Sequence, residues 1–549
     1  MLILGVSGAN DREHDPAACL IKDGKLIAMV EEERFCREKH APGIPPHNSI
    51  QFCLDQAEVS LDDIDYVALG WNYQKIPLWA EENTIENLSK IFFPKDLLNH
   101  KKEIKYKFYD HHLAHAASSF LFSDFKDSYL LVMDGQGETE STSIGFGFTD
   151  LTGSKKINFI KKYPIEYSLG YMYDKIGEYI GLGHWSAGKL MGLSPYGSRA
   201  LKLPFDYDEE GNYGIKFINN FVASKENYDD EDQLKNLWSD LLTTTVGQII
   251  TNNINPSKEA KNLALTAQNY LEKTTGHILK YLIGSSEHKS NNICISGGVG
   301  LNCSNNSFIR DVFGLNVFVQ PAANDAGVVL GAAALCSQEN GYLIKRPENV
   351  YFGPDFGDNA IEDLLKKNNL NYHKPDDLTQ KIAEALFDGC VVGWFQGKME
   401  YGPRALGGRS ILAKPDSKVM LKKINTLKGR EHWRPLAPIV CEEDAKKYFG
   451  IESSPFMLFF TKVNERFLKT FPAITHVDGT TRPQTVDKSH KLLHRLLSDY
   501  KKLSGHSVLI NTSFNIKGEP IVCSPEDAIS SFLKSELDIL AIGNYIVRK

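Results

Sequence analysis

The sequence predicts an α/β protein of two domains, and three observations support this prediction. Short apolar strands alternate with helical segments along the chain. Two similar strand–polar loop–strand units lie near residues 2–31 and 128–148, which suggests an internal duplication. A segment rich in Gly, Pro and Asn at 340–360 is typical of a linker. The length of 549 residues also favours more than one domain.

The first unit of the duplication opens the chain. Residues 2–7, 17–21 and 26–31 are predicted strands, and Asp23-Gly24 between two apolar runs predicts a hairpin turn. A polar loop at 8–15 joins the first two strands. The chain begins on a strand and lacks the pattern of a signal peptide.

The second unit repeats this arrangement. Residues 128–133 are a predicted strand, 134–138 a polar loop and 143–148 a return strand. If the two duplicated lobes face each other, both polar loops meet at one central cleft.

The remaining elements follow in order. The pattern over 234–283 is mainly helical, and 328–335 predicts a buried helix because its residues are small and apolar. Beyond the linker, alternating strands and helices are long enough for a second domain with its own core. We place the domains at 1–345 and 346–549. The other predicted elements are strands at 292–295, 317–320 and 391–395 and a helix at 378–388.

Composition and charge exclude several classes of protein. The net charge of −7 argues against a general nucleic-acid binder, so no nucleic-acid partner is expected. No run of 18 apolar residues indicates a transmembrane helix, so no membrane partner is expected either. Nine scattered cysteines without a Cys-x-x-Cys pair indicate reduced thiols and a cytoplasmic location.

The strongest local signal is a histidine cluster. His111 and His115 are four residues apart and share a face if this segment is helical, so both imidazoles can bind one metal ion. His112 points elsewhere. An isolated His-x-x-x-His pair is also common as an ordinary core or surface feature.

Two aspartates strengthen the metal hypothesis. Asp134 and Asp325 each end a predicted strand at the head of a polar turn, where a carboxylate can meet a ligand. Each alone is also typical of a turn or a helix cap. Together with the two histidines they form a mixed nitrogen and oxygen set suited to Fe(II), Mn(II) or zinc.

A glycine-rich turn follows the strand at 292–295. In Ser296-Gly297-Gly298-Val299-Gly300, backbone amides could lie against a phosphate or a nucleotide. It matches neither a Walker A motif nor a dinucleotide fingerprint, and a plain tight turn remains the alternative.

Basic residues gather in turns of the second domain. Arginine can hold a phosphate through a bidentate fork, whereas lysine offers a point charge. Placement among Gly and Pro residues favours a binding site over a solvated basic face. The residues are Arg404, Arg409, Lys428, Arg430, Arg434 and Arg482, followed by Asn511 and Ser513 after a strand.

His14 lies in the first polar loop. An imidazole with a pKa near neutral can take a proton from an attacking hydroxyl. A lone loop histidine is usually structural, but the duplication directs this loop at the cleft.

Several ordered motifs together resemble those of the NodU-type O-carbamoyltransferases, which modify Nod factors, aminoglycosides and cephamycins. The resemblance spans essentially the whole chain. One departure is Ser186-Ala187 before Gly188-Lys189, where the family often has an acidic residue. The motifs are 111–116, 133–135, 188–193, 296–302, 402–407, 434–438 and 511–515.

The resemblance implies a fold and an activity for each domain. The N-terminal domain is similar to the TsaD-type branch of the actin/sugar-kinase/Hsp70 fold, and the C-terminal domain is similar to YrdC-like α+β domains. In the family, the C-terminal domain makes carbamoyl-AMP from carbamoyl phosphate and ATP, with Mg²⁺. The N-terminal domain transfers the carbamoyl group to a hydroxyl of a small-molecule natural product or sugar, as in antibiotic biosynthesis.

The resemblance also implies residue roles. His14 is the general base, and His111, His115, Asp134 and Asp325 hold Fe(II). Carbamoyl adenylate binds to Lys39, Gly135, Gly297, Gly298 and Asn302. Carbamoyl phosphate binds to Arg404, Lys428 and Arg434, and ATP to Arg482, Asn511 and Ser513.

Three other functions stay open at this point. A tRNA threonylcarbamoyl-transfer enzyme shares both domain types, but the domain order and acidic charge favour a small-molecule acceptor. A phosphotransferase of the sugar-kinase fold has no use for the histidine pair and the arginine cluster. A nucleotide sensor of the Hsp70-like type has no need of His14 or a complete metal set.

Overall fold

The computed structural model describes residues 1–10, 13–76, 80–81, 83–95, 98, 100–215, 231–247, 249 and 251–549, without the side chains of 215 and 231–236. Internal contacts divide the chain into two compact units. The first comprises Met1–Glu32 and Ala41–Glu348, and the second comprises Glu33–His40 and Asn349–Lys549. A short segment from near the N-terminus therefore belongs to the second unit. The predicted α/β class is confirmed.

Two five-stranded sheets form the first unit, and a two-stranded hairpin accompanies them. One sheet contains β1 (Leu2–Val6), β2 (Ala17–Lys22), β3 (Lys25–Glu31), β4 (Tyr66–Leu69) and β5 (Tyr106–Phe108). The other contains β6 (Asp127–Met133), β7 (Glu140–Thr149), β8 (Lys155–Pro164), β11 (Asn292–Ser296) and β12 (Asn316–Val319). The hairpin is β9 (Phe205–Tyr207) with β10 (Tyr213–Ile215).

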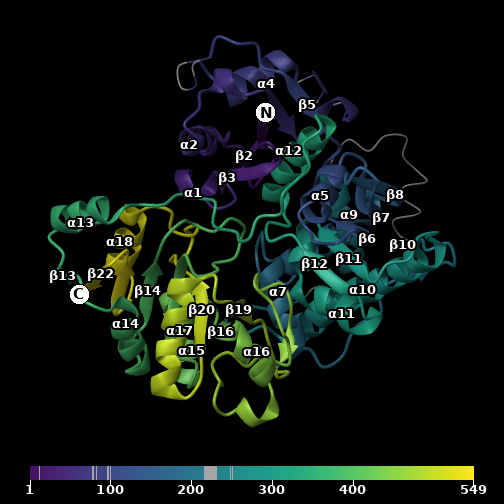
Figure 1. Ribbon diagram of the computed structural model, residues 1–549. Helices are drawn as coiled ribbons and strands as arrows, with labels where there is room; N and C mark the ends of the chain where they lie inside the picture. The colour runs from purple at the N-terminus through teal and green to yellow at the C-terminus, as the bar shows by residue number, and fades with distance from the viewer. Residues whose placement is uncertain are drawn as a thin grey trace. The chain divides into compact units, whose positions relative to one another are not determined.

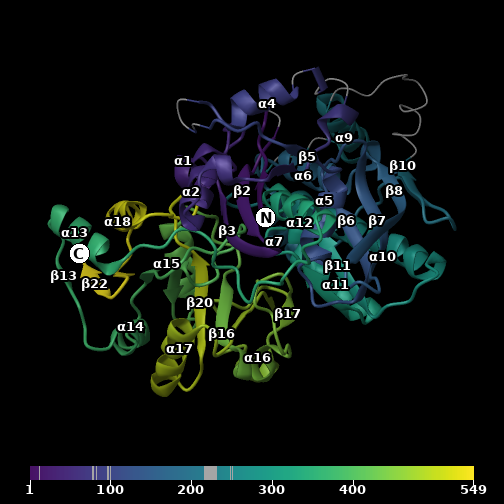
Figure 2. The ribbon, with the colours of Figure 1, turned by 45° about the horizontal axis from the view of Figure 1, so that its top comes forward.

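The two sheets have the same topology, which confirms the duplication. Their strand orders are β3-β2-β1-β4-β5 and β8-β7-β6-β11-β12; the second set is labelled in Figure 1, and β6, β7, β8 and β11 are also labelled in Figure 2. In each sheet the first three strands form an antiparallel meander, and the last two run parallel to the strand that begins the lobe. Equivalent loops therefore leave β1 and β6 at equivalent edges.

Two helices of the first unit pack against each other between the sheets. An added Cβ at Gly331 of α12 would overlap the carbonyl oxygen of Ala114 in α5, so the two backbones are in close contact. The helices of this unit are α2 (His47–Ala57), α4 (Ile85–Phe92), α5 (His111–Phe120), α6 (Leu169–Tyr179), α7 (Ala187–Leu193), α9 (Glu231–Val246), α10 (Lys258–Ser285), α11 (Cys303–Phe313) and α12 (Val328–Glu339).

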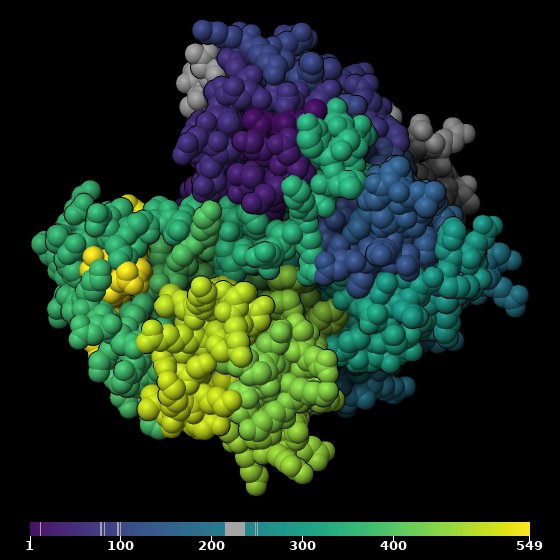
Figure 3. All heavy atoms as spheres, viewed as in Figure 1, coloured from purple at the N-terminus to yellow at the C-terminus, as the bar shows by residue number. Residues whose placement is uncertain are grey.

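The chain that follows α12 joins the two lobes of the first unit. The amide of Lys345 donates to the carbonyl of Gly24 in the β2–β3 turn, and Leu343 packs on Gly24 and Gly153. In the space-filling view, green atoms of the part of the chain around residues 328–348 lie between the purple N-terminal atoms and blue atoms of the second lobe (Figure 3). The segment predicted as a linker therefore begins as a structural connection within the first unit.

An eight-stranded mixed sheet forms the second unit, in the order β13-β22-β21-β14-β15-β20-β16-β19. Its strands are β13 (Tyr372–His373), β14 (Val392–Phe395), β15 (Arg409–Ala413), β16 (Ala437–Cys441), β19 (Gln484–Val486), β20 (Val508–Ser513), β21 (Ile539–Ile542) and β22 (Tyr545–Arg548). A short pair joins β17 (Thr461–Lys462) to β18 (Thr480–Thr481). The helices are α1 (Glu33–Cys36), α13 (Asp358–Lys367), α14 (Leu378–Phe387), α15 (Lys418–Leu427), α16 (Glu442–Phe449), α17 (Lys491–Ser504) and α18 (Pro525–Lys534).

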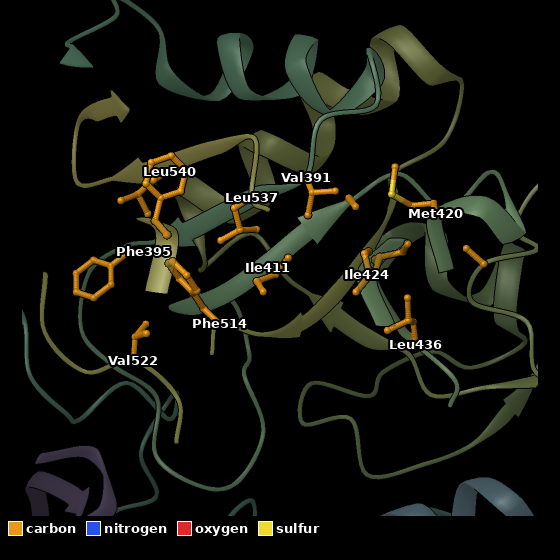
Figure 4. Packing of buried hydrophobic residues seen from close by; sticks show 14 of the residues in the cluster. Val391, Phe395, Ile411, Met420, Ile424, Leu436, Phe514, Val522, Leu537 and Leu540 are labelled. Carbon is orange, nitrogen blue, oxygen red and sulfur yellow. The ribbon is translucent and has the colours of Figure 1, made fainter. Parts of the chain in front are cut away.

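Both faces of this sheet are buried. Ile411 and Ile510 lie in one apolar cluster, whereas their neighbours Leu412 and Leu509 lie in another. Consecutive strand residues point to opposite faces, so runs of apolar residues are needed where both faces are covered. The first cluster, which includes Ile411 and Phe514, is drawn in Figure 4. The second is completed by α14 and α17, which pack on each other.

The position of Asp325 differs from the prediction. Asp325 does not end a strand, because β12 stops at Val319 and Asp325 begins a short 3₁₀ turn that leads into α12.

In the part of the chain that the structure describes, none of the helices has the length and apolar character needed to cross a membrane.

Candidate metal centre and anion site

Helix α5 supplies two buried imidazoles to a cluster in the first unit. His111 and His115 lie one turn apart on the face turned inward, and both side chains are fully buried. The carboxylate of Glu138 accepts the backbone N–H of His111 at 2.8 Å and so satisfies a buried donor in the first turn of the helix. The predicted helical pairing of the two histidines is confirmed.

Two loops bring carboxylates to these imidazoles. Asp134 directly follows β6, and Asp325 begins the turn before α12. The Nε2 atom of His115 lies 2.9 Å from Oδ2 of Asp134 and 3.7 Å from Oδ1 of Asp325. One ligand atom from each of the four side chains lies within 4.8 Å of all the others.

The hydrogen bonds around this cluster leave its inner atoms ready for a cation. His111 Nδ1 lies 3.0 Å from the carbonyl oxygen of Gly70, which can only accept, so Nδ1 donates and a neutral His111 presents a lone pair on Nε2. This Nε2 is 3.1 Å from Nε2 of His115 and 3.5 Å from Oδ2 of Asp134. Acceptors so close to one another fit a bound metal ion. The ring of Trp71 stacks on the imidazole of His111, with 3.8 Å between the ring centroids, and fixes the imidazole plane.

Electrostatics in this cluster favour a positive charge. Burial raises the pKa of the Asp134 carboxyl, but the two imidazoles outweigh that effect and hold it well below its usual range. Burial lowers the pKa of His115, but Asp134 and Asp325 outweigh burial and raise it to about 9. Without an ion, protons therefore supply the charge that these carboxylates require.

The loop between β1 and β2 is organised by a buried glutamate. Glu13 accepts the backbone N–H groups of Gly8 and Ala9 at 2.9 and 3.1 Å, and the hydroxyl of Tyr73 at 3.0 Å. Burial raises the pKa of its carboxyl. These bonds shape the described part of the loop, whose residues 11 and 12 lie outside the described chain.

His14 follows Glu13 in this loop. Its Nδ1 is 3.0 Å from Oδ2 of Asp15. Its ring makes a T-shaped contact with the ring of Trp185, with 4.5 Å between the ring centroids. Burial lowers the pKa of His14, but Asp325, Asp15 and Asp134 outweigh burial and raise it to about 10. His14 thus lies within electrostatic range of the metal-ligand cluster, and it is protonated at neutral pH while those carboxylates lack a cation.

The glycine-rich turn after β11 supports Asp134. Gly297 has a φ of +86°, and an added Cβ would overlap the carbonyl oxygen of Met133, so only glycine fits this position. The N–H groups of Gly298 and Gly135 donate to Oδ1 of Asp134 at 3.1 and 2.7 Å. These backbone groups, which the resemblance assigns to the adenylate, orient the carboxylate of Asp134, a candidate metal ligand.

Asn302 caps a helix at the end of the same turn. Its side-chain oxygen accepts the backbone N–H of Asn305 at 3.0 Å, and its amide exchanges two hydrogen bonds with Gln268. Gln268 in turn accepts the hydroxyl of Tyr173 at 2.7 Å. The side chain implied to contact the adenylate is therefore held in a buried amide pair.

The second unit contains a cluster of cations on loops around β15 and β20. Burial, together with the positive charges of Arg434, Arg482 and Arg404, lowers the pKa of the Arg430 guanidinium to about 9. Burial also places the pKa of Lys428 well below its usual range, with added effects from Arg430, Arg434 and Lys39. Cations that depress one another's ionisation in this way form a site for anions.

Lys428 is the buried member of this cluster. Its Nζ atom donates to the carbonyl and side-chain oxygens of Asn515 at 3.0 and 2.7 Å, and to the carbonyl of Ser513 at 2.5 Å. The hydroxyl of Ser513 donates to the Asn515 side chain at 2.7 Å. Lys428 and Ser513, predicted to bind different substrates, therefore lie in direct contact.

Two polar side chains from the predicted set make hydrogen bonds within the fold of the second unit. Arg409 is fully buried, stacks on Phe395 and donates to several backbone carbonyls, including that of Pro354 at 3.0 Å. Asn511 donates to the carbonyl of Ala405 and to Gln484 at 3.1 and 2.7 Å. Its buried Oδ1 has no hydrogen-bond partner among the described residues.

Sequence reasoning missed the acidic residues that shape these sites. Glu13, Glu138 and Glu400 are buried carboxylates that each accept two or more backbone N–H groups. Glu400 holds the 402–408 turn through the amides of Leu406 and Gly408. The available signal in the sequence was a glutamate within a few residues of a glycine-rich loop, which could have indicated that its carboxylate binds the backbone of that loop.

Comparison with known proteins gives the family of this chain. A family model described as Carbamoyltransferase N-terminus matches residues 3–91 and 83–334, and one described as Carbamoyltransferase C-terminus matches 383–549. The chain belongs to the carbamoyltransferase family. It is therefore an enzyme, and the resemblance inferred from the motifs is confirmed.

Two relatives that match in sequence agree with this assignment. The chain is 34% identical over its whole length to nodulation protein NolNO of Sinorhizobium fredii strain NGR234, covering 83% of that protein. It is 27% identical to nodulation protein U of Rhizobium fredii, over 92% of this chain and 89% of the relative. Among solved structures, T. kodakarensis HypF matches 63% of this carbamoyltransferase and 48% of its own chain, with 11% identity and a TM-score of 0.35.

Proposed function

We propose that this carbamoyltransferase is an ATP-dependent O-carbamoyltransferase. Its second unit forms carbamoyl-AMP from carbamoyl phosphate and ATP with Mg²⁺. Its first unit transfers the carbamoyl group to a hydroxyl of a small-molecule natural product or sugar. The scattered positions of its nine cysteines, without a Cys-x-x-Cys pair, favour a reducing compartment, and we propose the cytoplasm.

The observation that supports adenylate formation best is the cation cluster of the second unit. Burial lowers the pKa values of Lys428, Arg430 and Arg434, and nearby arginines lower each of them further, although arginine and lysine are ordinarily charged at neutral pH. Carbamoyl phosphate and ATP together carry several negative charges, which would relieve this repulsion on binding. Because bound anions would stabilise these clustered cations, the cluster favours carbamoyl phosphate and ATP as substrates.

Adenylate formation requires two bond exchanges. The carbamoyl–phosphate bond breaks with consumption of one water and release of phosphate, and a carbamate oxygen then attacks the α-phosphorus of ATP. Pyrophosphate leaves, and carbamoyl-AMP remains. Arg404, Lys428 and Arg434 are proposed to hold carbamoyl phosphate, and Arg482 and Ser513 to hold ATP.

Transfer in the first unit requires a base. The acceptor hydroxyl attacks the carbamoyl carbon, AMP leaves, and the hydroxyl proton passes to His14. The side chains of His111, His115, Asp134 and Asp325 fit a divalent ion by donor type and spacing. Fe(II), which the resemblance implies, would supply charge that offsets the carboxylates and lowers the pKa of His14 toward the range of a base.

The adenylating half-reaction tests this proposal without knowledge of the acceptor. Purified, metal-loaded protein is incubated with ATP, Mg²⁺ and labelled pyrophosphate, with and without carbamoyl phosphate. We expect label to enter ATP only when carbamoyl phosphate is present. Folded protein that gives no such exchange would contradict the proposed function of the second unit.

A further inference from the structure

The Glu33–His40 segment crosses from the first unit and becomes part of the second. It comprises the four-residue helix α1 and a turn in which Arg37 and His40 have positive φ angles of 61° and 64°. Glu33 closes this segment on itself, because its carboxylate accepts the backbone N–H of His40 at 2.7 Å and pairs with Arg34 at 2.5 Å. The segment is therefore an internally bonded insert.

Arg34 fastens the segment to one loop of the anion site. Its guanidinium is 2% exposed and donates from Nη2 to the carbonyl oxygen of Gly402 at 2.8 Å. Gly402 lies two residues before Arg404, in the turn that Glu400 closes from the other end. The position of Arg404 thus depends on a bond from residue 34.

Arg37 fastens the same segment to a second loop. It donates to the carbonyl oxygens of Ile521 and Pro520 at 2.6 and 3.0 Å, and its Nε lies 3.3 Å from Asp527. Residue 520 adjoins Glu519, whose carbonyl accepts the amide of Asn515 at 2.5 Å, and Asn515 receives Lys428. Arg37 therefore supports the loop to which Lys428 is bound.

An apolar contact joins these two attachments. Phe35 packs on Met399, Ala405, Ile521 and Cys523, which come from both loops. One short segment thus places two guanidinium groups and an aromatic ring against both loops. Lys39 follows in the same segment and acts electrostatically on Lys428.

We propose that Arg34 and Arg37 are positioning residues for carbamoyl phosphate, which hold the loops of Arg404 and Lys428 so that the anion site of the second unit is incomplete without residues 33–40. Each arginine donates to backbone carbonyls that a shorter or apolar side chain leaves unsatisfied. A loop shift of about 1 Å at such a site lowers activity by roughly 100-fold. The activity readout of this inference rests on the proposed function, whereas its structural readout does not.

The test compares full-length wild type with Arg34→Met and Arg37→Met. Hydrogen exchange of backbone amides is expected to rise in residues 401–409 for Arg34→Met and in 515–523 for Arg37→Met, with the rest of the second unit unchanged. In pyrophosphate exchange, both variants should raise the KM for carbamoyl phosphate about tenfold or more, and the KM for ATP less. Arg34→Lys should restore part of the loss, because lysine keeps one donor.

Arg495→Met is the matched control, since Arg495 is 60% exposed and pairs with Asp377 at the surface of the same unit. This control should leave hydrogen exchange in the two loops unchanged. It should also leave the KM for carbamoyl phosphate and the KM for ATP unchanged. Increased hydrogen exchange throughout the second unit, or unchanged exchange in both loops, would overturn the inference. Failure of wild type to exchange pyrophosphate would instead contradict the proposed function and leave the hydrogen-exchange result to decide the role of the segment.

Discussion

At the scale of single residues, the two units present opposite kinds of uncompensated charge. In the first unit, the buried carboxylates of Asp134 and Asp325 attract positive charge and raise the pKa of His115 to about 9. In the second unit, Arg430 and Lys428 face other cations. The first arrangement selects a cation and the second selects anions, because burial makes each imbalance costly.

His506 gives a pH dependence whose sign follows from its surroundings. It lies between α17 and β20, packs edge-on against Phe471, and accepts the backbone N–H of Val508. Burial lowers its pKa to about 4. The folded chain therefore binds this proton less tightly than the unfolded chain does, and stability that is full above pH 6.5 is lost as pH falls through 4.

We expect His506→Asn to reduce this acid sensitivity, because asparagine keeps an acceptor for Val508 but cannot be protonated. Between pH 7 and 4.5 the variant should lose about 2–3 kcal/mol less stability than wild type. Urea unfolding at both pH values measures the difference. His373→Asn, at an exposed position of the same unit, serves as the control, and equal acid sensitivity of wild type and His506→Asn would refute the assignment.

At the scale of elements, the metal cluster depends on the contact between α5 and α12. Gly331 allows the two backbones to approach, since a side chain there would overlap Ala114. Helix α5 carries both histidines, and α12 directly follows the turn that carries Asp325. The close contact of α5 with α12 at Gly331 therefore sets the spacing of three of the four candidate ligands, namely His111, His115 and Asp325.

Gly331→Ala tests this dependence. The new methyl group must push the helices apart, so we expect a loss of about 1–3 kcal/mol in stability together with weaker metal binding. Thermal unfolding and titration with a divalent metal measure the two effects. Gly284→Ala in α10, where an added Cβ meets nothing within 4 Å, should be neutral or slightly stabilising and should bind metal as wild type does. Unchanged metal affinity in Gly331→Ala would contradict the proposed coupling.

At the scale of the whole molecule, the chain crosses between its units more than once. Residues 1–32 and 41–348 form the first unit, and residues 33–40 rejoin the sheet-containing segment 349–549. Each unit nevertheless has its own apolar cores and its own charged cluster. We therefore expect the two proposed half-reactions to be impaired separately by substitution, although cutting the chain near residue 345 would separate Arg34 from Gly402.

Reciprocal substitutions test this division of labour. His115→Ala should lose bound metal and transfer activity but keep carbamoyl phosphate-dependent pyrophosphate exchange. Arg404→Met should keep the metal and lose exchange by about 100-fold or more. Elemental analysis and pyrophosphate exchange on the same samples give both readouts, with His277→Ala of α10 as the control. Loss of exchange in metal-depleted His115→Ala would show that the two sites are not independent.

Sequence patterns alone were enough for the α/β class, the duplication and the helical pairing of His111 with His115. Those features follow from local rules: strand and helix periodicity, turn residues and the 3.6-residue turn. The family also followed from ordered motifs. Tertiary structure alone showed that Arg409 and Asn302 are held by fold contacts, and that Asp325 belongs to a turn.

The placement of residues 33–40 shows most clearly what local rules leave undetermined. Nothing in Glu33–His40 differs from a short polar connection, yet Arg34 and Arg37 reach carbonyls more than 360 positions away in the sequence. Sequence separation does not limit such contacts, because burial of a guanidinium depends on which acceptors surround it once the chain has folded. Local patterns thus specify the helices, the strands and the functional groups available, whereas the folded chain specifies which side chains share a site.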